Sequence, residues 1–420
     1  ASPPVTSALG PVSPLDLSFG STSAVPGTVS TDGKPPFLET VYDAVTDVDG
    51  SVVLAARASF DPLNPIDPSR LARYRQDGSL DPAFGAGGLV TVPSIAAGQE
   101  PIVDVAIDGS RRLLATRYSQ VDRVLPSGSV DLSFAPIEAG AGVPFDSIGG
   151  TTPDSIGRVV VWGYSGQQHF VARYTVAGNL DATFAAGSAT PGVLPVDFRV
   201  MAAPIVISGD RVVVIGFVPG LPQRSLVMRI TASGARDSTF GPGIGPGFGA
   251  GVAAFDGAPG DETPLHATED SLGRVVMVGA GVGPTFQDRP AFVVRFDSSG
   301  LADSAFAAVS GPTTRKLLSP RTVIAGAGGR LYVIGNLPDT GSGADGAPGV
   351  VVLQDSGLPD SGFGWANTVD GVTEVVGLGD LRTGIVQGAA LGPDGRVMLW
   401  ADAASPYLAR LRAPGTDDLT

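Results

Sequence analysis

The chain has 420 residues, 43% of them hydrophobic, with 59 Gly, 36 Pro, no Cys and a net charge of −14. This acidity argues against nucleic acid and anionic lipid as partners, because both require a basic face. Without Cys the chain has no disulfides, no thiolate metal sites and no Cys nucleophile. No apolar run approaches the roughly 18 residues that span a bilayer, so we expect a soluble, turn-rich globular protein with no direct membrane insertion.

The N-terminal segment, residues 1–13, is small, polar and Pro-rich, and it does not begin with Met. We interpret it as a linker left after removal of a signal peptide. This interpretation predicts an exported protein that is secreted, periplasmic or on the cell surface. Residues 14–420 are predicted to form a single domain, because one repeat runs through them.

The repeat is a short turn motif in which an Asp precedes a Phe by three positions. Its Phe residues lie 65, 50, 50, 56, 66 and 57 residues apart, and a period of this size indicates a solenoid, propeller or array. The seven copies are Asp16–Phe19, Asp81–Phe84, Asp131–Phe134, Asp181–Phe184, Asp237–Phe240, Asp303–Phe306 and Asp360–Phe363.

Four short strands are predicted per repeat, and we call them a, b, c and d. Strand a follows the motif, as at 89–92, and strands b and c form a hairpin around a Gly turn, as at 41–48 and 51–54. Strand d ends in an Arg 11 positions before the Phe, and Val352 takes this place in the copy at Asp360–Phe363. The Arg residues of this series are Arg73, Arg123, Arg173, Arg229, Arg295 and, on the last strand, Arg410.

Seven units of four antiparallel strands predict an all-β fold, a seven-bladed β-propeller. The chain begins at a motif and ends on an Arg strand, so we predict a ring closed by the C-terminal strand joining the N-terminal blade. One detail fits poorly, because 418–420 (Asp-Leu-Thr) align with 16–18 (Asp-Leu-Ser) and the same turn is encoded twice.

The repeated Arg, Asp and Phe residues are interpreted as structural. An Arg at a strand end can pair with an Asp in the next turn, and every blade would solve the same packing problem in this way. The Phe residues are expected to lie in the core between blades. The Asp and Phe residues concerned are Asp81, Phe84, Asp131, Phe134, Asp181, Phe184, Asp237, Phe240, Asp303 and Phe306.

Residues 73–88 (Arg-Tyr-Arg-Gln-Asp-Gly-Ser-Leu-Asp-Pro-Ala-Phe-Gly-Ala-Gly-Gly) resemble the delta-60 repeat, a family of bacterial repeats of about this length. The resemblance extends over residues 14–420. It implies a propeller-like all-β repeat and an exported or surface protein, and it implies no defined activity. The sequence departs from the pattern at Val352 and at Ala135, Ala185 and Ala307, where the motif has Gly.

Candidate binding residues lie on the predicted b strands. The chain has only two His residues, so a Ser-His-Asp mechanism would depend on His169 or His266. His169 opens a d strand, where we expect a surface role. His266 is flanked by carboxylates that include Glu262, which would raise its pKa or build a small His/Asp metal site. It occupies the place in its blade that Asp43 occupies in the first, and with Asp104 these residues form our candidate set near the axial channel.

No cofactor is expected, and calcium is a second ion to consider. Asp43, Asp47 and Asp49 precede Gly50 and offer hard oxygen ligands, but the closing bidentate Glu of a helix-loop-helix calcium site is missing.

Loop length suggests where a partner would bind. The c–d loops (60–69, 281–290, 338–348) and a–b loops (253–264, 369–381) vary, and both kinds emerge on the same face of a propeller. We therefore predict a non-enzymatic scaffold that binds a surface protein or glycan through the loops of blades 1, 5, 6 and 7. The alternative is a hydrolase or lyase acting on a polysaccharide or ester in the axial channel, and a third hypothesis is a rigid spacer within a longer surface protein. The sequence leaves both the enzymatic question and the oligomeric state open.

Overall fold

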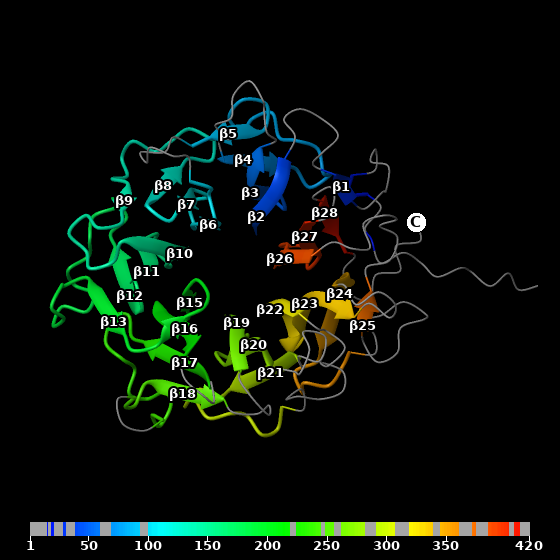
Figure 1. The fold of residues 1–420 in the computed structure, drawn as a ribbon. Helices are drawn as coiled ribbons and strands as arrows, with labels where there is room; N and C mark the ends of the chain where they lie inside the picture. The colour runs from blue at the N-terminus through cyan, green and yellow to red at the C-terminus, as the bar shows by residue number, and fades with distance from the viewer. Residues whose placement is uncertain are drawn as a thin grey trace, which may run out of the picture.

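Seven small β-sheets are arranged as blades around a central axis (Figure 1). The computed structural model describes residues 15, 18–20, 28–30, 38–58, 69–92, 100–218, 224–244, 248–255, 262–281, 291–306, 319–338, 345–360, 372–374, 385–402 and 407–411. The predicted all-β, seven-bladed propeller with antiparallel blades is confirmed. The proposed linker, residues 1–13, lies outside the described residues. Among those residues, no helix is long and apolar enough to cross a membrane.

The first three blades each contain four antiparallel strands, which follow one another from the axis outward. Blade 1 contains β2 (Leu38–Thr46), β3 (Val52–Ala58), β4 (Ser69–Tyr74) and β5 (Leu89–Thr91). Blade 2 contains β6 (Asp104–Ile107), β7 (Leu113–Thr116), β8 (Gln120–Val124) and β9 (Ile137–Glu138). Blade 3 contains β10 (Ser147–Pro153), β11 (Val159–Ser165), β12 (Gln168–Tyr174) and β13 (Val193–Val196).

The other four blades follow the same plan with local variations. Blade 4 has an interrupted inner strand, β14 (Arg199–Val200) and β15 (Ile205–Ile207), followed by β16 (Arg211–Phe217), β17 (Ser225–Ile230) and β18 (Val252–Phe255). The described part of blade 5 is β19 (Glu262–Glu269), β20 (Val275–Gly281) and β21 (Ala291–Phe296). Blade 6 contains β22 (Ser319–Ala325), a 3-10 turn η3 (Ala327–Gly329), β23 (Leu331–Pro338), β24 (Asp345–Leu353) and β25 (Val372–Glu374). Blade 7 contains β26 (Ile385–Leu391), β27 (Val397–Asp402), β28 (Tyr407–Arg410) and β1 (Thr28–Ser30).

The grouping of strands into sheets differs from the prediction at one point. Strand a was expected to share a sheet with the hairpin that follows it, but it pairs with the Arg strand before it, as β5 does with β4. The reason is the motif itself, a tight turn in which the Asp81 N–H donates to the Arg73 carbonyl and folds the chain back. Consequently the N-terminal strand β1 completes the C-terminal blade by pairing with β28, instead of the C-terminal strand completing an N-terminal blade.

The hydrophobic core is divided among the junctions between blades. Each cluster of buried side chains in the described residues draws on two neighbouring blades, and buried Phe residues of the motifs, such as Phe84, Phe184 and Phe240, lie within them. Strands such as β7, β8 and β17 are buried along their whole length. This agrees with continuous apolar strands stacked between adjacent sheets.

A Gly in the turn after the Arg strands of blades 1 to 5 permits close contact between blades. Gly128 adopts φ +89°, and a Cβ there would lie 2.5 Å from the backbone N of Gly85 in the preceding motif. The Gly85 N–H donates to the Ser127 carbonyl at 2.8 Å. Any larger residue at 128 would separate the two blades.

Candidate functional site

The repeated Arg, Asp and Phe residues form a buried unit at the blade junctions. In the copy at Asp237–Phe240, Arg229 Nε donates to Asp237 Oδ2 at 2.7 Å, and Nη2 donates to Thr239 Oγ1 at 3.0 Å. The guanidinium carbon lies 4.5 Å from the centre of the Phe240 ring. Nη1 donates to the Ser298 carbonyl in the next blade at 3.0 Å. Arg229 therefore joins its own turn to the neighbouring blade.

This unit recurs around the ring. Although burial on its own raises it, the pKa of Asp237 is held below its usual value by hydrogen bonds from Thr239 and by Arg229. Guanidinium carbons lie 4.4–5.0 Å from the rings in the pairs Arg73–Phe84, Arg123–Phe134, Arg173–Phe184, Arg295–Phe306 and Arg410–Phe19. The matching ion pairs are Arg73–Asp81, Arg123–Asp131, Arg173–Asp181 and Arg295–Asp303. These groups contact one another, and their geometry is that of a clamp between blades.

The copy at Asp360–Phe363 takes its cation from outside the Arg strands. Val352 takes the Arg position there, and Arg330, which precedes β23, donates to Asp360 at 2.7 Å. The substituted copy therefore keeps a guanidinium beside its Asp, which explains how Val352 is accommodated.

The Arg strand near the C-terminus contacts the motif near the N-terminus. Arg410 on β28 donates to Ser18 Oγ at 3.1 Å and lies over Phe19. The N-terminal copy of the duplicated turn thus occupies the place beside the last Arg strand. Residues 418–420, the second copy, lie outside the described part of the chain.

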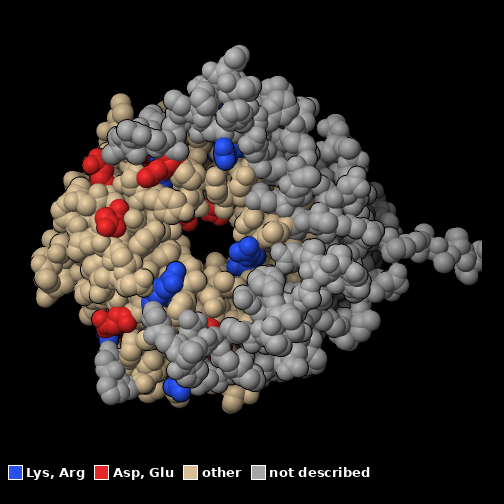
Figure 2. All heavy atoms as spheres, in the orientation of Figure 1, with Lys and Arg blue, Asp and Glu red and all other residues tan. Residues whose placement is uncertain are grey.

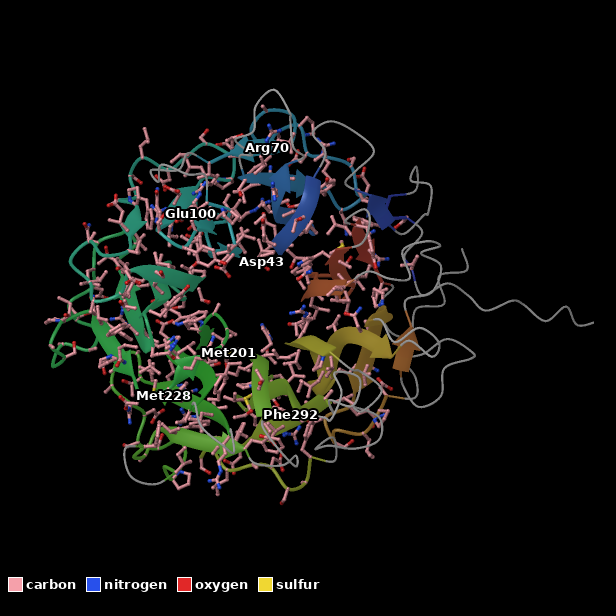
Figure 3. The ribbon with its side chains drawn as sticks, viewed as in Figure 1. Asp43, Arg70, Glu100, Met201, Met228 and Phe292 are labelled. Carbon is pink, nitrogen blue, oxygen red and sulfur yellow. The ribbon has the colours of Figure 1, made fainter. Side chains whose placement is uncertain are left out.

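A cavity lies among the inner strands of the ring. A space of about 370 Å³ is lined by inner-strand residues of blades 1 to 5, including Asp104 on β6 and His266 on β19. Figure 3 places Asp43 beside the central opening. Figure 2 shows that opening, with basic side chains at its rim on the face in view. The structure therefore brings Asp43, Asp104 and His266 to the same channel wall.

Both channel carboxyls bond the inner strand of the next blade. Asp43 Oδ2 accepts from the Val105 N–H at 2.9 Å, and Asp104 Oδ2 accepts from the Thr151 N–H at 3.0 Å. Burial, together with the nearby Asp104 charge, raises the pKa of Asp43 well above its usual value. Burial also raises the pKa of Asp104 to about 6, against hydrogen bonds from Thr151 and Thr116 that lower it. Both carboxyls therefore stay protonated to a higher pH than an ordinary Asp. Each also takes part in the junction with the next blade.

His266 behaves differently from the expectation. Burial lowers its pKa to about 4, whereas we expected carboxylates to raise it. Its Nδ1 accepts a long hydrogen bond of 3.5 Å from the Val323 N–H in blade 6. The imidazole is therefore neutral at pH 7 and, like the two carboxyls, contacts the next blade.

The acidic residues near His266 in sequence do not form a cluster with it. Glu262 is fully buried at the start of β19, four residues before His266. Glu269 accepts hydrogen bonds from Ser208, and Asp270 forms an ion pair with Arg274. The register of β19 shifts between Pro264 and His266, which breaks the alternation of sides along the strand, so adjacency in sequence did not produce a His/carboxylate cluster.

Opposed pKa shifts give a testable pH dependence. Folded Asp104 holds its proton between pH 3.8 and about 6 where the unfolded chain has lost it, so this group's contribution to stability falls as pH rises through that window. His266 is neutral when folded between pH 4 and 6.5, so its contribution rises with pH. Relative to the parent, the free energy of unfolding of Asp104→Asn should increase as pH rises to about 6, on the order of 2 kcal/mol. The free energy of unfolding of His266→Gln should instead increase relative to the parent as pH falls.

Urea unfolding of both variants at pH 4 to 7 measures these differences. Asp146→Asn, at an exposed position, is the control for removing one negative charge. Difference curves for Asp104→Asn and His266→Gln that are flat across the range would show that neither group is buried in the wall as described.

The proposed calcium loop is occupied by a cation of the protein itself. Arg111 Nε donates to Asp47 Oδ2 at 2.8 Å, and the guanidinium also pairs with Asp49. Asp43 lies on β2 and bonds Val105 instead of facing these residues. In the described ranges, no group of three or more His, Asp or Glu residues is placed to hold a metal ion.

The loops predicted to carry function can be followed only in part. Most of 60–69, 253–264, 281–290, 338–348 and 369–381 lies outside the described residues. The same face nevertheless carries a pocket at blades 3 and 4, beside the β11–β12 turn and strand β14. Its volume is about 260 Å³, and Trp162, Tyr164, His169 and Arg199 line it.

His169 lies in the wall of this pocket and is 5% exposed, so the expected surface role is wrong. Its ring stacks on Trp162 with 6.0 Å between centroids and 16° between planes. Trp162, Tyr164 and Arg199 belong to no repeated motif and were not among the predicted site residues. One signal was present: the alternation Trp-Gly-Tyr at 162–164, followed by the two-residue turn at 166–167, places two aromatic rings on one side near a hairpin end.

Comparison with known proteins supports the fold and leaves activity open. The family described as domain of unknown function (DUF5122) beta-propeller matches residues 49–84, which include strand β3, the Arg strand β4 and one motif. The chain therefore contains a β-propeller repeat. No curated protein matches the sequence.

Solved structures resemble the whole ring. Virginiamycin B lyase from Staphylococcus aureus is 12% identical with a TM-score of 0.55, covering 91% of this chain and 97% of the other. The Pan2 WD40 domain from Neurospora crassa is 10% identical with a TM-score of 0.53, covering 94% and 97%. A chain of a mitotic checkpoint complex is 12% identical with a TM-score of 0.53, covering 93% and 91%. At such identities these similarities show the fold alone.

Proposed function

We propose that this propeller is a binding scaffold that engages a surface protein or glycan through its a–b/c–d loop face. The observation that carries the proposal is the pocket at blades 3 and 4, where aromatic and polar side chains converge on that face. Pockets of this composition are typical of ligand sites. Loops on a rigid scaffold are also the usual place for recognition.

The contacts in the channel support a structural role for its polar groups. Asp43, Asp104 and His266 each accept a hydrogen bond from a backbone N–H of the next blade. Groups committed in this way are positioned to hold the ring, and Asp104 is further held by a hydrogen bond from the Thr151 hydroxyl at 3.2 Å.

The proposal extends to family and location. The likeness of residues 73–88 to delta-60 repeats supports a bacterial exported protein, secreted, periplasmic or on the cell surface, with 14–420 as its single domain after a linker at 1–13. The scaffold needs no cofactor. We propose no nucleic-acid partner, since the net charge is −14.

A thermal-melt screen tests the proposed function. A ligand of the folded state raises the melting temperature by linkage, so the protein is melted with a panel of surface glycans and surface-protein fractions, each with and without chelator, calcium and zinc. We expect a shift with a glycan or protein that persists in chelator. A shift that depends wholly on calcium or zinc would contradict the cofactor-free scaffold, and no shift with any polymer would remove the binding function.

The alternative is a hydrolase or lyase acting in the channel on a polysaccharide or ester. The raised pKa values of Asp43 and Asp104 favour it, because catalytic acids and bases are often perturbed by burial. Polysaccharide and ester turnover by the parent protein that falls at least about 100-fold in Asp104→Asn and in His266→Ala would support this function. Turnover unaffected by both changes, or absent from the parent, would exclude it.

A further inference from the structure

The pocket at blades 3 and 4 is built from an ordered aromatic set. Trp162 and Tyr164 alternate along β11 and so face the same side, with ring centroids 5.9 Å apart. His169 is the cross-strand partner of Tyr164, and their ring centroids lie 5.7 Å apart. All three side chains line the cavity. Together they form an aromatic wall held by the β11–β12 hairpin, in which Tyr164 is tilted by 37° from Trp162 and by 30° from His169.

A hydrogen bond fixes which edge of His169 donates. The Trp162 Nε1–H donates to His169 Nδ1 at 3.0 Å. Burial and the Arg199 charge lower the pKa of His169, so the ring is neutral and its proton is on Nε2. No described residue accepts a hydrogen bond from this Nε2–H. The indole N–H is used within the wall, and the imidazole N–H remains as a donor.

Arg199 gives the pocket its charge. It lies on β14, is exposed, and stacks 5.8 Å from the Phe217 ring centre. No described carboxylate forms an ion pair with it, although Arg side chains of the blade junctions are paired throughout the ring. In a chain of net charge −14, an aromatic pocket with an unpaired guanidinium is complementary to an anion. Its charge also disfavours the cationic ligands that aromatic cages otherwise bind.

Size and chemistry narrow the class of ligand. The volume of about 260 Å³ lies below the roughly 300–1,000 Å³ of pockets for drug-sized molecules, so one ring fits. A pyranose has C–H faces that pack on aromatic rings and hydroxyls at its rim that meet Gln167 and the His169 N–H. A carboxylate on that ring would pair with Arg199 in a fork geometry.

We propose that this pocket binds a uronic acid residue of an acidic glycan, with the pyranose face on Trp162 and Tyr164 and the carboxylate on Arg199. The inference rests on the proposed function, because it names the ligand class for the same a–b/c–d face. A peptide carboxylate is the competing occupant. A peptide carboxylate has the negative charge that Arg199 would bind, but it has no apolar ring face to pack on Trp162 and Tyr164.

Calorimetry with defined oligogalacturonate tests the inference. The probes are trigalacturonate, its methyl ester of the same length and a blocked Glu-containing peptide. We expect the parent protein to bind trigalacturonate at least about tenfold more tightly than the ester, the usual gain from a charge-assisted hydrogen bond. Arg199→Gln should bind both equally, and Arg321→Gln, which removes an exposed Arg from β22, should behave like the parent.

Three results would overturn the inference. The ester could bind as well as the acid, Arg199→Gln could retain the preference, or the peptide could bind more tightly than trigalacturonate. If Arg199→Gln fails to fold, Gln167→Ala on the exposed turn serves instead, with an expected loss of affinity for acid and ester alike. Failure of all three probes while a surface polymer still shifts the melt would remove this inference and leave the proposed function standing.

Discussion

Replacing Arg229 with Met should lower the free energy of unfolding by about 3–5 kcal/mol, because it leaves the carboxylate of Asp237 buried without its partner. The change also removes the stacking on Phe240 and the hydrogen bond to the Ser298 carbonyl of blade 5. Urea unfolding at pH 7 measures the effect. The Met side chain keeps most of the volume, so the loss reports the charge and its hydrogen bonds.

Arg75→Met is the matched control. Arg75 also pairs with an Asp of the motif, Asp81, but at 3.4 Å and with its side chain 49% exposed. Exposed pairs contribute about 0–1 kcal/mol, so this variant should unfold almost like the parent. Equal effects of Arg229→Met and Arg75→Met would contradict the assignment of Arg229 to a buried clamp between blades.

Replacing Phe19 with Ala should cost about 3–5 kcal/mol, the usual range for removing a buried Phe. Phe19 is fully buried among Val41 and Leu54 of blade 1 and Trp400 of blade 7, under Arg410. It therefore seals the junction where the two ends of the chain meet. Differential scanning calorimetry of the variant gives the loss directly.

Two comparisons make this result specific to ring closure. Phe84→Ala removes the same side chain at an ordinary junction, and Leu132→Ala shortens a 94% exposed side chain of another motif. A closed ring predicts equal losses for Phe19→Ala and Phe84→Ala, with a change within about 0.5 kcal/mol for Leu132→Ala. A loss at Phe84 with none at Phe19 would mean that the ends do not pack together.

The repeat allowed most of the fold to be predicted from sequence, because every copy encodes the same turn, strand and core residue. The assignment of strands to sheets could not be read in the same way. The sequence of a motif does not determine whether the strand after it pairs with the strand before it or with the next hairpin. The pairing of β1 with β28 depends on contacts between residues nearly 400 positions apart.

The candidate site was predicted only where position in the blade determined it. Asp43, Asp104 and His266 lie on inner strands at the channel, as their places in the repeat suggested. Their chemistry depends on burial and on backbone groups of the next blade, which no local pattern reveals. The pocket of Trp162 and Arg199 joins two blades, and neither residue belongs to a motif.

Hydrogen exchange of the protein with and without the polymer found in the melt screen tests the central claim most directly. Binding on the a–b/c–d face predicts slower exchange at the β11–β12 turn and at Arg199–Val200, with the inner strands β6 and β19 unchanged. Protection confined to β6 and β19, around Asp104 and His266, would place the ligand in the axial channel and contradict the account.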